Sequence, residues 1–143
     1  MDMNSLSVIV RHSRTYLERE LQHYDIGYSE EVILMYLLDH ADVSQETVSR
    51  HFILDKGSIA KTMTKLEDKN LVHRYENPAN KREKLVSLTT AGKSLTIPCR
   101  QALEKFHQHL FQGLTQEDKQ KLSDIIEIME QNAISLTERN QES

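Results

Sequence analysis

Two short extended runs, in a chain otherwise patterned for helices, place the strongest limit on the fold. They are residues 71–75 (LVHRY) and 83–89 (EKLVSLT), joined by ENPANKR. Asn77-Pro78 in the joining segment is typical of a turn, and Pro78 disfavours helical geometry at Asn77. The pattern predicts one β-hairpin with a charged tip inside an α+β chain that is mostly α.

Apolar residues recur at spacings of three and four on both sides of this hairpin, which predicts amphipathic helices. Only four Gly and two Pro occur in 143 residues, which favours long helices with few loops. Pro98 is expected to bend or locally open the helix that contains it. The predicted helices are residues 5–24, ended by Gly27; a helix capped by Ser29; a short helix capped by Ser44 or Asp42; residues 57–70; residues 90–112, capped by Thr89 or Thr90 and stopped by Gly113; and a last helix that opens at Thr115.

Residues 57–70 present two different faces. Ile59, Met63 and Leu66 stand at positions i, i+4 and i+7, which gives one narrow apolar stripe. At 100° per residue, the opposite face carries hydrogen-bonding and cationic groups and no large apolar side chain. The members of that face are Gly57, Ser58, Lys61, Thr64 and Lys65.

A short helix, a tight connection (ILDK), a second helix and a hairpin follow one another from residue 44 to residue 89. A short helix joined to a second by a tight turn is a helix-turn-helix, and the hairpin makes it winged. In this motif the second helix enters the DNA major groove. The hairpin tip then meets the sugar-phosphate backbone or the minor groove.

The charge distribution agrees with a DNA-binding role. The whole chain has a net charge of -4, yet residues 56–84 hold eight Lys or Arg and four Asp or Glu, a net charge of +4. A local basic region in an acidic chain is what a polyanion-binding face looks like. Two alternatives stay open: a solvated basic surface, and a winged helix that uses the same face for an acidic protein partner.

Four stretches of the sequence resemble the MarR family of bacterial and archaeal winged-helix regulators. They are SQETVSRHF, GSIAKTMTKLEDKNLVHRYENPANKR, VSLTTAGK and LTQEDKQKL, and the resemblance covers about residues 5–138. This sequence differs from the D-x-R signature of the family's wing, because Asn80 stands at the acidic position and only Arg82 matches. Asn can accept a hydrogen bond but adds no charge to steady the Arg. Asn70 stands where the family usually has Gly, and Asn tolerates the left-handed conformation of a helix end.

The resemblance implies a single domain, residues 1–143, with a winged core at 29–89 and dimerisation helices at 5–24 and 90–138. Apolar stripes on the first and last helices, which a second copy of the chain would bury, agree with a homodimer. A two-fold symmetric dimer matches a palindromic operator in double-stranded DNA. The implied function is a transcriptional regulator, with repression favoured over activation. The resemblance also implies that a small aromatic or anionic effector releases the protein from DNA.

We expect the DNA-binding residues to divide by role. Ser58, Lys61 and Lys65 face base edges or nearby phosphates, and Thr62 reaches a phosphate. Backbone N–H groups at Ser44 and Gln45 bind a phosphate at a helix N-terminus. The remaining candidates are Lys56 at the start of the second helix, Lys81, Arg82 and Lys84 of the wing, and Arg74 beside it. The effector crevice implied by the resemblance is lined by Arg11, His12, Tyr16 and Tyr36, although the same rings also suit a structural role.

Other function classes lack support in the sequence. No enzyme motif occurs, such as a Gly-rich phosphate loop, H-E-x-x-H or G-x-S-x-G, and no cofactor is expected. His107 and His109 point about 200° apart on a helix, so they cannot share a metal ion. Cys99, the single cysteine, is expected to be buried packing, with a redox-responsive regulator as the alternative. Without a disulfide, a secretory signal or an apolar run of membrane-spanning length, we expect a cytoplasmic protein.

Overall fold

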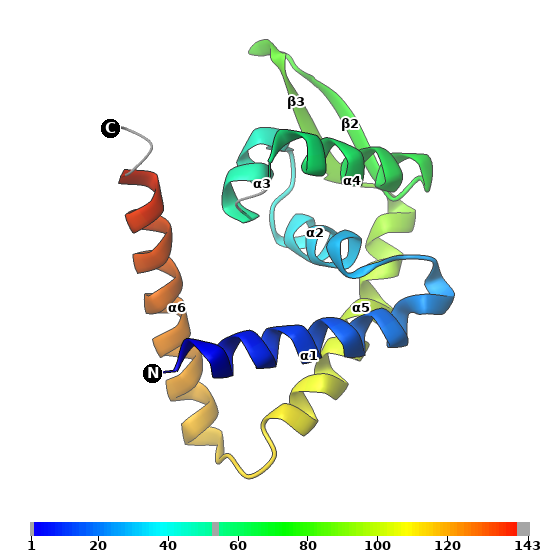
Figure 1. Cartoon of the computed structure of the whole chain (residues 1–143). Helices are drawn as coiled ribbons and strands as arrows, with labels where there is room; N and C mark the ends of the chain where they lie inside the picture. Colours follow the sequence, from blue (N-terminus) through cyan, green and yellow to red (C-terminus); the bar gives the residue numbers. More distant parts are fainter. Residues whose placement is uncertain (1, 53–54, 140–143) are drawn as a thin grey trace. The chain divides into compact units, whose positions relative to one another are not determined.

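The computed structural model describes residues 2–52 and 55–139, apart from the side chains of Lys56 and Arg139. Helices dominate, and one small antiparallel sheet accompanies them (Figure 1). This arrangement confirms the α+β, mostly α, winged helix-turn-helix class. The elements are α1 (Met3–Leu21), η1 (Gln22–Tyr24), α2 (Tyr28–Asp39), β1 (Val43–Ser44), α3 (Gln45–Phe52), α4 (Lys56–Asp68), β2 (Val72–Asn77), β3 (Asn80–Leu88), α5 (Thr90–Leu110) and α6 (Gln116–Arg139).

The sheet has the strand order β1-β3-β2, and both pairings are antiparallel. β2 and β3 form the predicted hairpin, with Val72 opposite Leu88. Sequence reasoning missed β1, which pairs Val43 with Val86. A two-residue strand is too short to show an alternating apolar pattern, so only its pairing partner reveals it.

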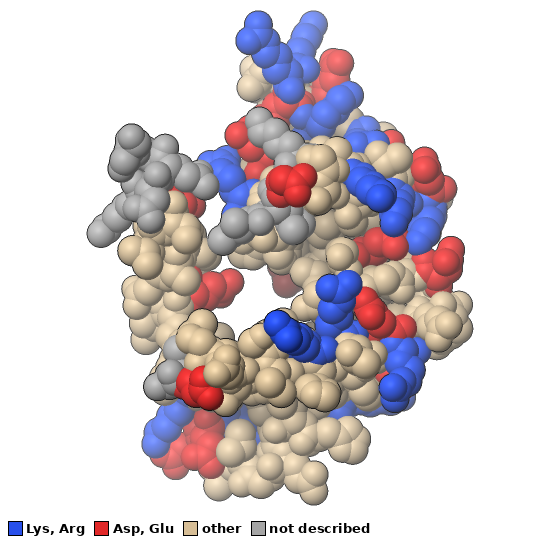
Figure 2. All heavy atoms as spheres, viewed as in Figure 1, with Lys and Arg blue, Asp and Glu red and all other residues tan. Residues whose placement is uncertain are grey.

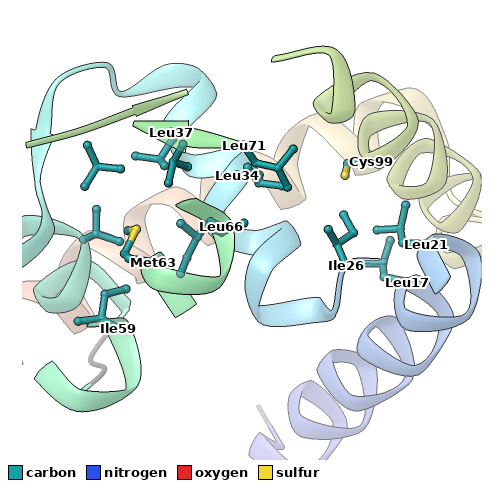
Figure 3. Packing of buried hydrophobic residues seen from close by; sticks show 14 of the residues in the cluster. Leu17, Leu21, Ile26, Leu34, Leu37, Ile59, Met63, Leu66, Leu71 and Cys99 are labelled. Atoms are coloured by element: carbon teal, nitrogen blue, oxygen red, sulfur yellow. The ribbon is translucent and has the colours of Figure 1, made fainter. Parts of the chain in front are cut away.

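The winged core is packed around the apolar stripe predicted for α4. Ile59, Met63 and Leu66 are buried, together with Val48 of α3 and Val86 of β3. Figure 3 shows the three α4 side chains projecting from one face of the helix toward the other buried residues. Burying each such side chain stabilises the fold by about 1.5–3 kcal/mol. Because this face of α4 is held in the core, the opposite face points outward.

The C-terminal end of α4 has the hydrogen bonds of a Schellman motif. Asn70 is left-handed, with φ 58°, which confirms that Asn replaces Gly at this position. The N–H of Leu71 donates to the carbonyl of Leu66 at 2.9 Å, and the N–H of Asn70 donates to that of Glu67 at 2.8 Å. The helix therefore ends firmly, and the chain turns directly into β2.

α5 begins against this same turn. The Thr89 hydroxyl accepts the N–H of Gly92 at 3.0 Å, so Thr89 is the cap. A Cβ on Gly92 would lie 2.0 Å from the carbonyl oxygen of Leu71, so only glycine permits this close approach. α5 is one uninterrupted helix through Pro98, so that residue does not open it. Gly113, with φ 88°, stands in the turn after α5.

The connection between α1 and α2 differs from the prediction. α1 ends at Leu21 and is followed by the short helix η1, so the predicted helix over 5–24 is two helices. Ser29 was expected to cap α2, and this prediction was wrong. Gly27 is the N-cap, and its N–H donates to the Glu30 carboxylate at 3.4 Å. Extended backbone at Gly27, together with a glutamate three residues on, starts the helix two residues earlier than predicted.

α6 begins after Thr115, where the sequence predicts, and its first turn is held by a reciprocal capping box. Thr115 Oγ1 accepts the N–H of Asp118 at 3.1 Å, and the Asp118 carboxylate accepts the N–H of Thr115 at 2.9 Å. The chain divides into two compact units, residues 1–106 and 107–143, with the boundary inside α5. Among the described helices, none is both long and apolar enough to cross a lipid bilayer.

Candidate nucleic-acid interface

The outward face of α4 is the centre of the candidate interface. Because Ile59 and Leu66 are buried, Lys61 and Lys65 point away from the core, and both side chains are exposed. Thr62 lies at the flank, where its hydroxyl donates to the carbonyl of Ser58 at 3.1 Å. Two long cations one turn apart on an exposed helix face suit contacts with phosphates or with guanine acceptors.

Asp55 fixes the start of this helix. Its carboxylate accepts the Ser58 N–H at 2.8 Å and the Ser58 hydroxyl at 2.7 Å, and these bonds lower the pKa of Asp55. The Ser58 hydroxyl proton is therefore committed within the protein, and its oxygen can still accept a bond from DNA. Sequence reasoning missed Asp55, although Asp-x-x-Ser before an apolar stripe is a helix-start signal. The Lys56 side chain, another predicted contact, lies outside the described residues.

The start of α3 is held by Ser44. Its hydroxyl accepts the Thr47 N–H at 3.0 Å and is 2.7 Å from the Thr47 hydroxyl. Ser44 is buried, so its side chain belongs to the cap, as predicted for the helix start. Gln45 is half-buried, and its side-chain oxygen accepts a bond from Arg74 at 3.5 Å. Ser44 and Gln45 lie at the N-terminus of α3, so the groups there that suit a phosphate are backbone N–H groups and not these side chains.

Arg74 is half-buried, and its side chain bridges three elements. From β2 it pairs with Glu67 of α4 at 2.9 Å, and it also donates to Thr64 at 3.4 Å. The hydrogen bond from Arg74 is the main reason that the pKa of Glu67 is lowered. Through these contacts and its bond to Gln45, Arg74 connects the wing to the helix-turn-helix. The geometry favours this structural role over the predicted DNA contact.

The wing presents its cations to solvent. Lys81, Arg82 and Lys84 are exposed on β3, and Figure 2 shows basic side chains at the tip of the hairpin. Asn80 accepts the backbone N–H of Arg82 at 3.2 Å, so it shapes the turn and does not hold the guanidinium. Asn77 also shapes the turn, accepting the N–H of Ala79 at 3.0 Å. The uncharged Asn80 thus keeps a structural role.

The four predicted effector-binding residues are distributed between different surroundings. Arg11 and His12 are exposed on α1. Tyr16 packs against Phe106 of α5, with ring centroids 5.5 Å apart. Tyr36 belongs to another ring cluster, with His40 at 4.1 Å, His51 at 4.6 Å and Phe52 at 5.4 Å. The packing of both tyrosine rings agrees with the structural alternative.

Glu31 of α2 and Cys99 of α5 are buried groups that can ionise. Glu31, in the first turn of α2, is 3% exposed, and burial raises its pKa to about 7. Cys99 of α5 is fully buried, and burial, with the charge of Glu31 as a second cause, raises the pKa of its thiol to about 12. A thiol protonated at neutral pH is a poor nucleophile, which disfavours the redox alternative. Among the described residues, no three His, Cys, Asp or Glu form a group that could hold a metal ion.

Comparisons with known proteins agree with this geometry. The family model "MarR family" matches residues 28–84. The HTH-type transcriptional regulator YdgJ of Bacillus subtilis is 28% identical over 100 residues, which are 69% of this chain and 61% of that relative. A MarR transcriptional regulator from Methanosarcina mazei Go1 has a TM-score of 0.88 at 26% identity, over 93% of this chain and 96% of that one. A mutant MarR from E. coli, crystallised with operator DNA, has a TM-score of 0.76 at 24% identity, over 88% and 91% of the two chains.

Proposed function

This chain belongs to the MarR family of winged helix-turn-helix transcriptional regulators, and from that premise we propose that it is a cytoplasmic, homodimeric repressor of a palindromic operator. The observation that carries the proposal is the exposed face of α4, with Lys61 and Lys65, beside a basic wing. The E. coli relative crystallised with operator DNA supports the same use of this fold. We propose no catalytic activity.

The proposed contacts divide into those that specify sequence and those that supply affinity. Lys61 and Lys65 lie on the face of α4 that would enter the major groove, so they read base edges or their nearest phosphates. Lys81, Arg82 and Lys84 extend from the wing and meet the backbone. Cation contacts with phosphate release counterions, so binding falls steeply as salt rises.

The homodimer is supported by apolar side chains on the terminal helices. Val8 and Val10 of α1 are exposed, and so are Ile125 and Ile128 of α6. Exposed apolar surface of this kind marks an interaction site in a water-soluble chain. A second copy that covers these helices would place two winged cores about a two-fold axis, which matches two operator half-sites.

We propose that a small aromatic or anionic effector releases the protein from its operator. The predicted effector residues are Arg11 and His12, exposed on α1, and Tyr16 and Tyr36, which lie in two separate ring clusters. Arg11 would pair with the charge of a small aromatic anion. An effector would act by favouring a half-site spacing that does not fit DNA. Benzoate provides a simple probe, and release of bound operator by benzoate that Arg11→Ala weakens would support this site.

The deciding experiment measures binding of the full chain to the intergenic DNA upstream of its own gene, against random DNA of equal length, at two salt concentrations. We expect a preference of about a thousandfold or more, which is within the usual range for operator-binding proteins. Lys61→Ala should reduce this preference, while Lys81→Ala should weaken binding to both DNAs alike. No binding at low salt would overturn the proposal and favour an acidic protein partner.

A further inference from the structure

We propose that α1 takes part in DNA binding, with Arg14 as a phosphate contact on the rim of the major groove opposite the wing. The inference rests on the proposed insertion of α4 into the groove and adds a contact to it. Nothing in the helix-turn-helix or the wing requires a residue from α1. The assignment comes from what lies on each side of α4.

The two flanks of α4 face different elements. Thr64 and Glu67 contact Arg74 of β2, so this flank faces the wing. At 100° per residue, Ser58 and Lys65 lie on the other side of the buried stripe. A helix in the major groove lies between two phosphate backbones, one on each rim. The wing lies beside one rim, so an element that stands beside Ser58 and Lys65 would lie beside the other rim.

A cleft of about 340 Å³ occupies that second flank. Its walls include Lys61 and Lys65 of α4, Tyr28 and Ser29 at the start of α2, and Arg14 of α1. Three cations line this cleft, and two of them are the predicted DNA-reading lysines. Two carboxylates, Glu18 and Glu30, line it as well, and Glu30 is paired with Lys69 at 2.8 Å. The lining therefore keeps a net positive charge. Figure 2 shows basic side chains over the wing, over α4 and over the middle of α1 on the same face of the unit formed by residues 1–106.

The Arg14 side chain is held in position beside the cleft, but its contacts within the protein are weak. Its guanidinium lies 5.5 Å from the centroid of the Tyr28 ring, a cation–π arrangement that limits its freedom. Its Nε donates to Glu18 at 3.0 Å, and both side chains are largely exposed, at 58% and 44%. An exposed pair one helical turn apart is readily exchanged for a stronger partner. A phosphate is such a partner, because a guanidinium can bind it through two parallel N–H bonds.

The test compares Arg14→Ala with Arg19→Ala in the full chain, by fluorescence anisotropy on the same upstream and random duplexes over a range of salt. Arg19 is exposed on the same helix and carries the same charge, so it controls for the change in net charge. We expect Arg14→Ala to weaken both DNAs by roughly tenfold and to reduce the salt slope by about 0.9, as for one lost phosphate contact. Arg19→Ala should stay within about twofold of the parent.

Two further variants test how Arg14 acts. Tyr28→Leu should lose part of the affinity and Tyr28→Phe should not, if the ring positions the guanidinium. Glu18→Gln should tighten binding about twofold, because it frees Arg14 and removes a like charge from the cleft. Circular dichroism and thermal melting of each variant show whether the fold is retained.

The outcomes separate this inference from the proposed function. If Arg14→Ala behaves like Arg19→Ala while Lys61→Ala loses operator preference, the chain binds DNA through α4 and the α1 contact is wrong. If the parent protein binds no DNA at low salt, the proposed function fails instead. A fall in affinity for Arg14→Ala with an unchanged salt slope would also overturn the phosphate contact.

Discussion

The winged core and α6 place their large apolar side chains in opposite environments. In the winged core, Met63 and Leu66 are fully buried. On α6, Ile128 is 62% exposed and Leu136 is 66% exposed, although this helix has an apolar stripe of the same kind. An amphipathic stripe predicts that a helix will bury one face, but it does not say against what. The core supplies its own partner surface, whereas α6 requires another one.

The largest expected effect tests that requirement. Ile125→Glu should raise the dimer dissociation constant at least about a thousandfold, because two-fold symmetry would bury two unpaired carboxylates in one interface. Sedimentation equilibrium of the full chain measures the constant. Gln131→Glu, on the opposite face of the same helix, adds the same charge and should leave the dimer intact. An unchanged dimer for Ile125→Glu would show that this face of α6 is not the interface.

A matched pair of leucines tests the difference directly. Leu66→Ala should cost about 2–5 kcal/mol in the free energy of unfolding, since the lost contacts leave a cavity in the core. Leu136→Ala makes the same chemical change at an exposed site and should cost less than about 0.5 kcal/mol. Urea denaturation of dilute protein measures both. Equal losses would contradict the division into a self-sufficient core and partner-dependent helices.

Glu31 is one of two glutamates that the winged core buries, and the other, Glu30, pairs with Lys69. Burial raises the pKa of Glu31 from the ordinary glutamate value of 4.5 to about 7, so the folded state holds the proton over that interval. Stability contributed by this group therefore falls as pH rises from about 4.5 to about 7 and is flat above. Glu31→Gln removes that dependence and should gain up to about 3 kcal/mol at pH 8 and little at pH 4.5.

Urea denaturation at the two pH values, compared with the parent, isolates the contribution of Glu31. Glu46→Gln provides the control, because Glu46 is also in the first turn of a helix but is exposed. A gain that is equal at both pH values would mean that Glu31 keeps its ordinary pKa. A loss at pH 8 would mean that the carboxylate makes a favourable contact in the folded state.

How far the sequence predicted this molecule differs between its elements. The buried stripe of α4, the hairpin around Asn77 and the left-handed Asn70 all follow from local rules, and the structure confirms them. The cap of α2 was misplaced, because Ser29 and Gly27 are both acceptable caps and only the contact from Glu30 decides between them. Local patterns therefore located the elements well and their ends less well.

The candidate interface was harder to predict, because its contacts join distant parts of the chain. A basic residue beside the wing looks like a DNA contact in sequence, yet Arg74 is drawn inward by Glu67 of α4. Arg14 and Lys65 line one cleft although 50 positions separate them. Neither the Arg74–Glu67 pair nor the shared cleft of Arg14 and Lys65 follows from a repeating pattern of residues along the sequence. What the sequence identified was the exposed face of α4, because that face is set by the buried one.

The smallest expected effect concerns the helix caps of the two regions. Ser44 is buried in the winged core, so Ser44→Ala removes the cap of α3 and leaves the Thr47 hydroxyl without its bond, at about 1–2 kcal/mol. Thr115→Ala removes the exposed cap of α6 and should cost no more than about 1 kcal/mol. Hydrogen exchange locates each loss: the first variant should expose amides throughout the winged core, and the second only those in the first turns of α6. Loss of protection in the core for Thr115→Ala would mean that both regions unfold as one cooperative unit, and the contrast between them would then lie in their surfaces and not in their stability.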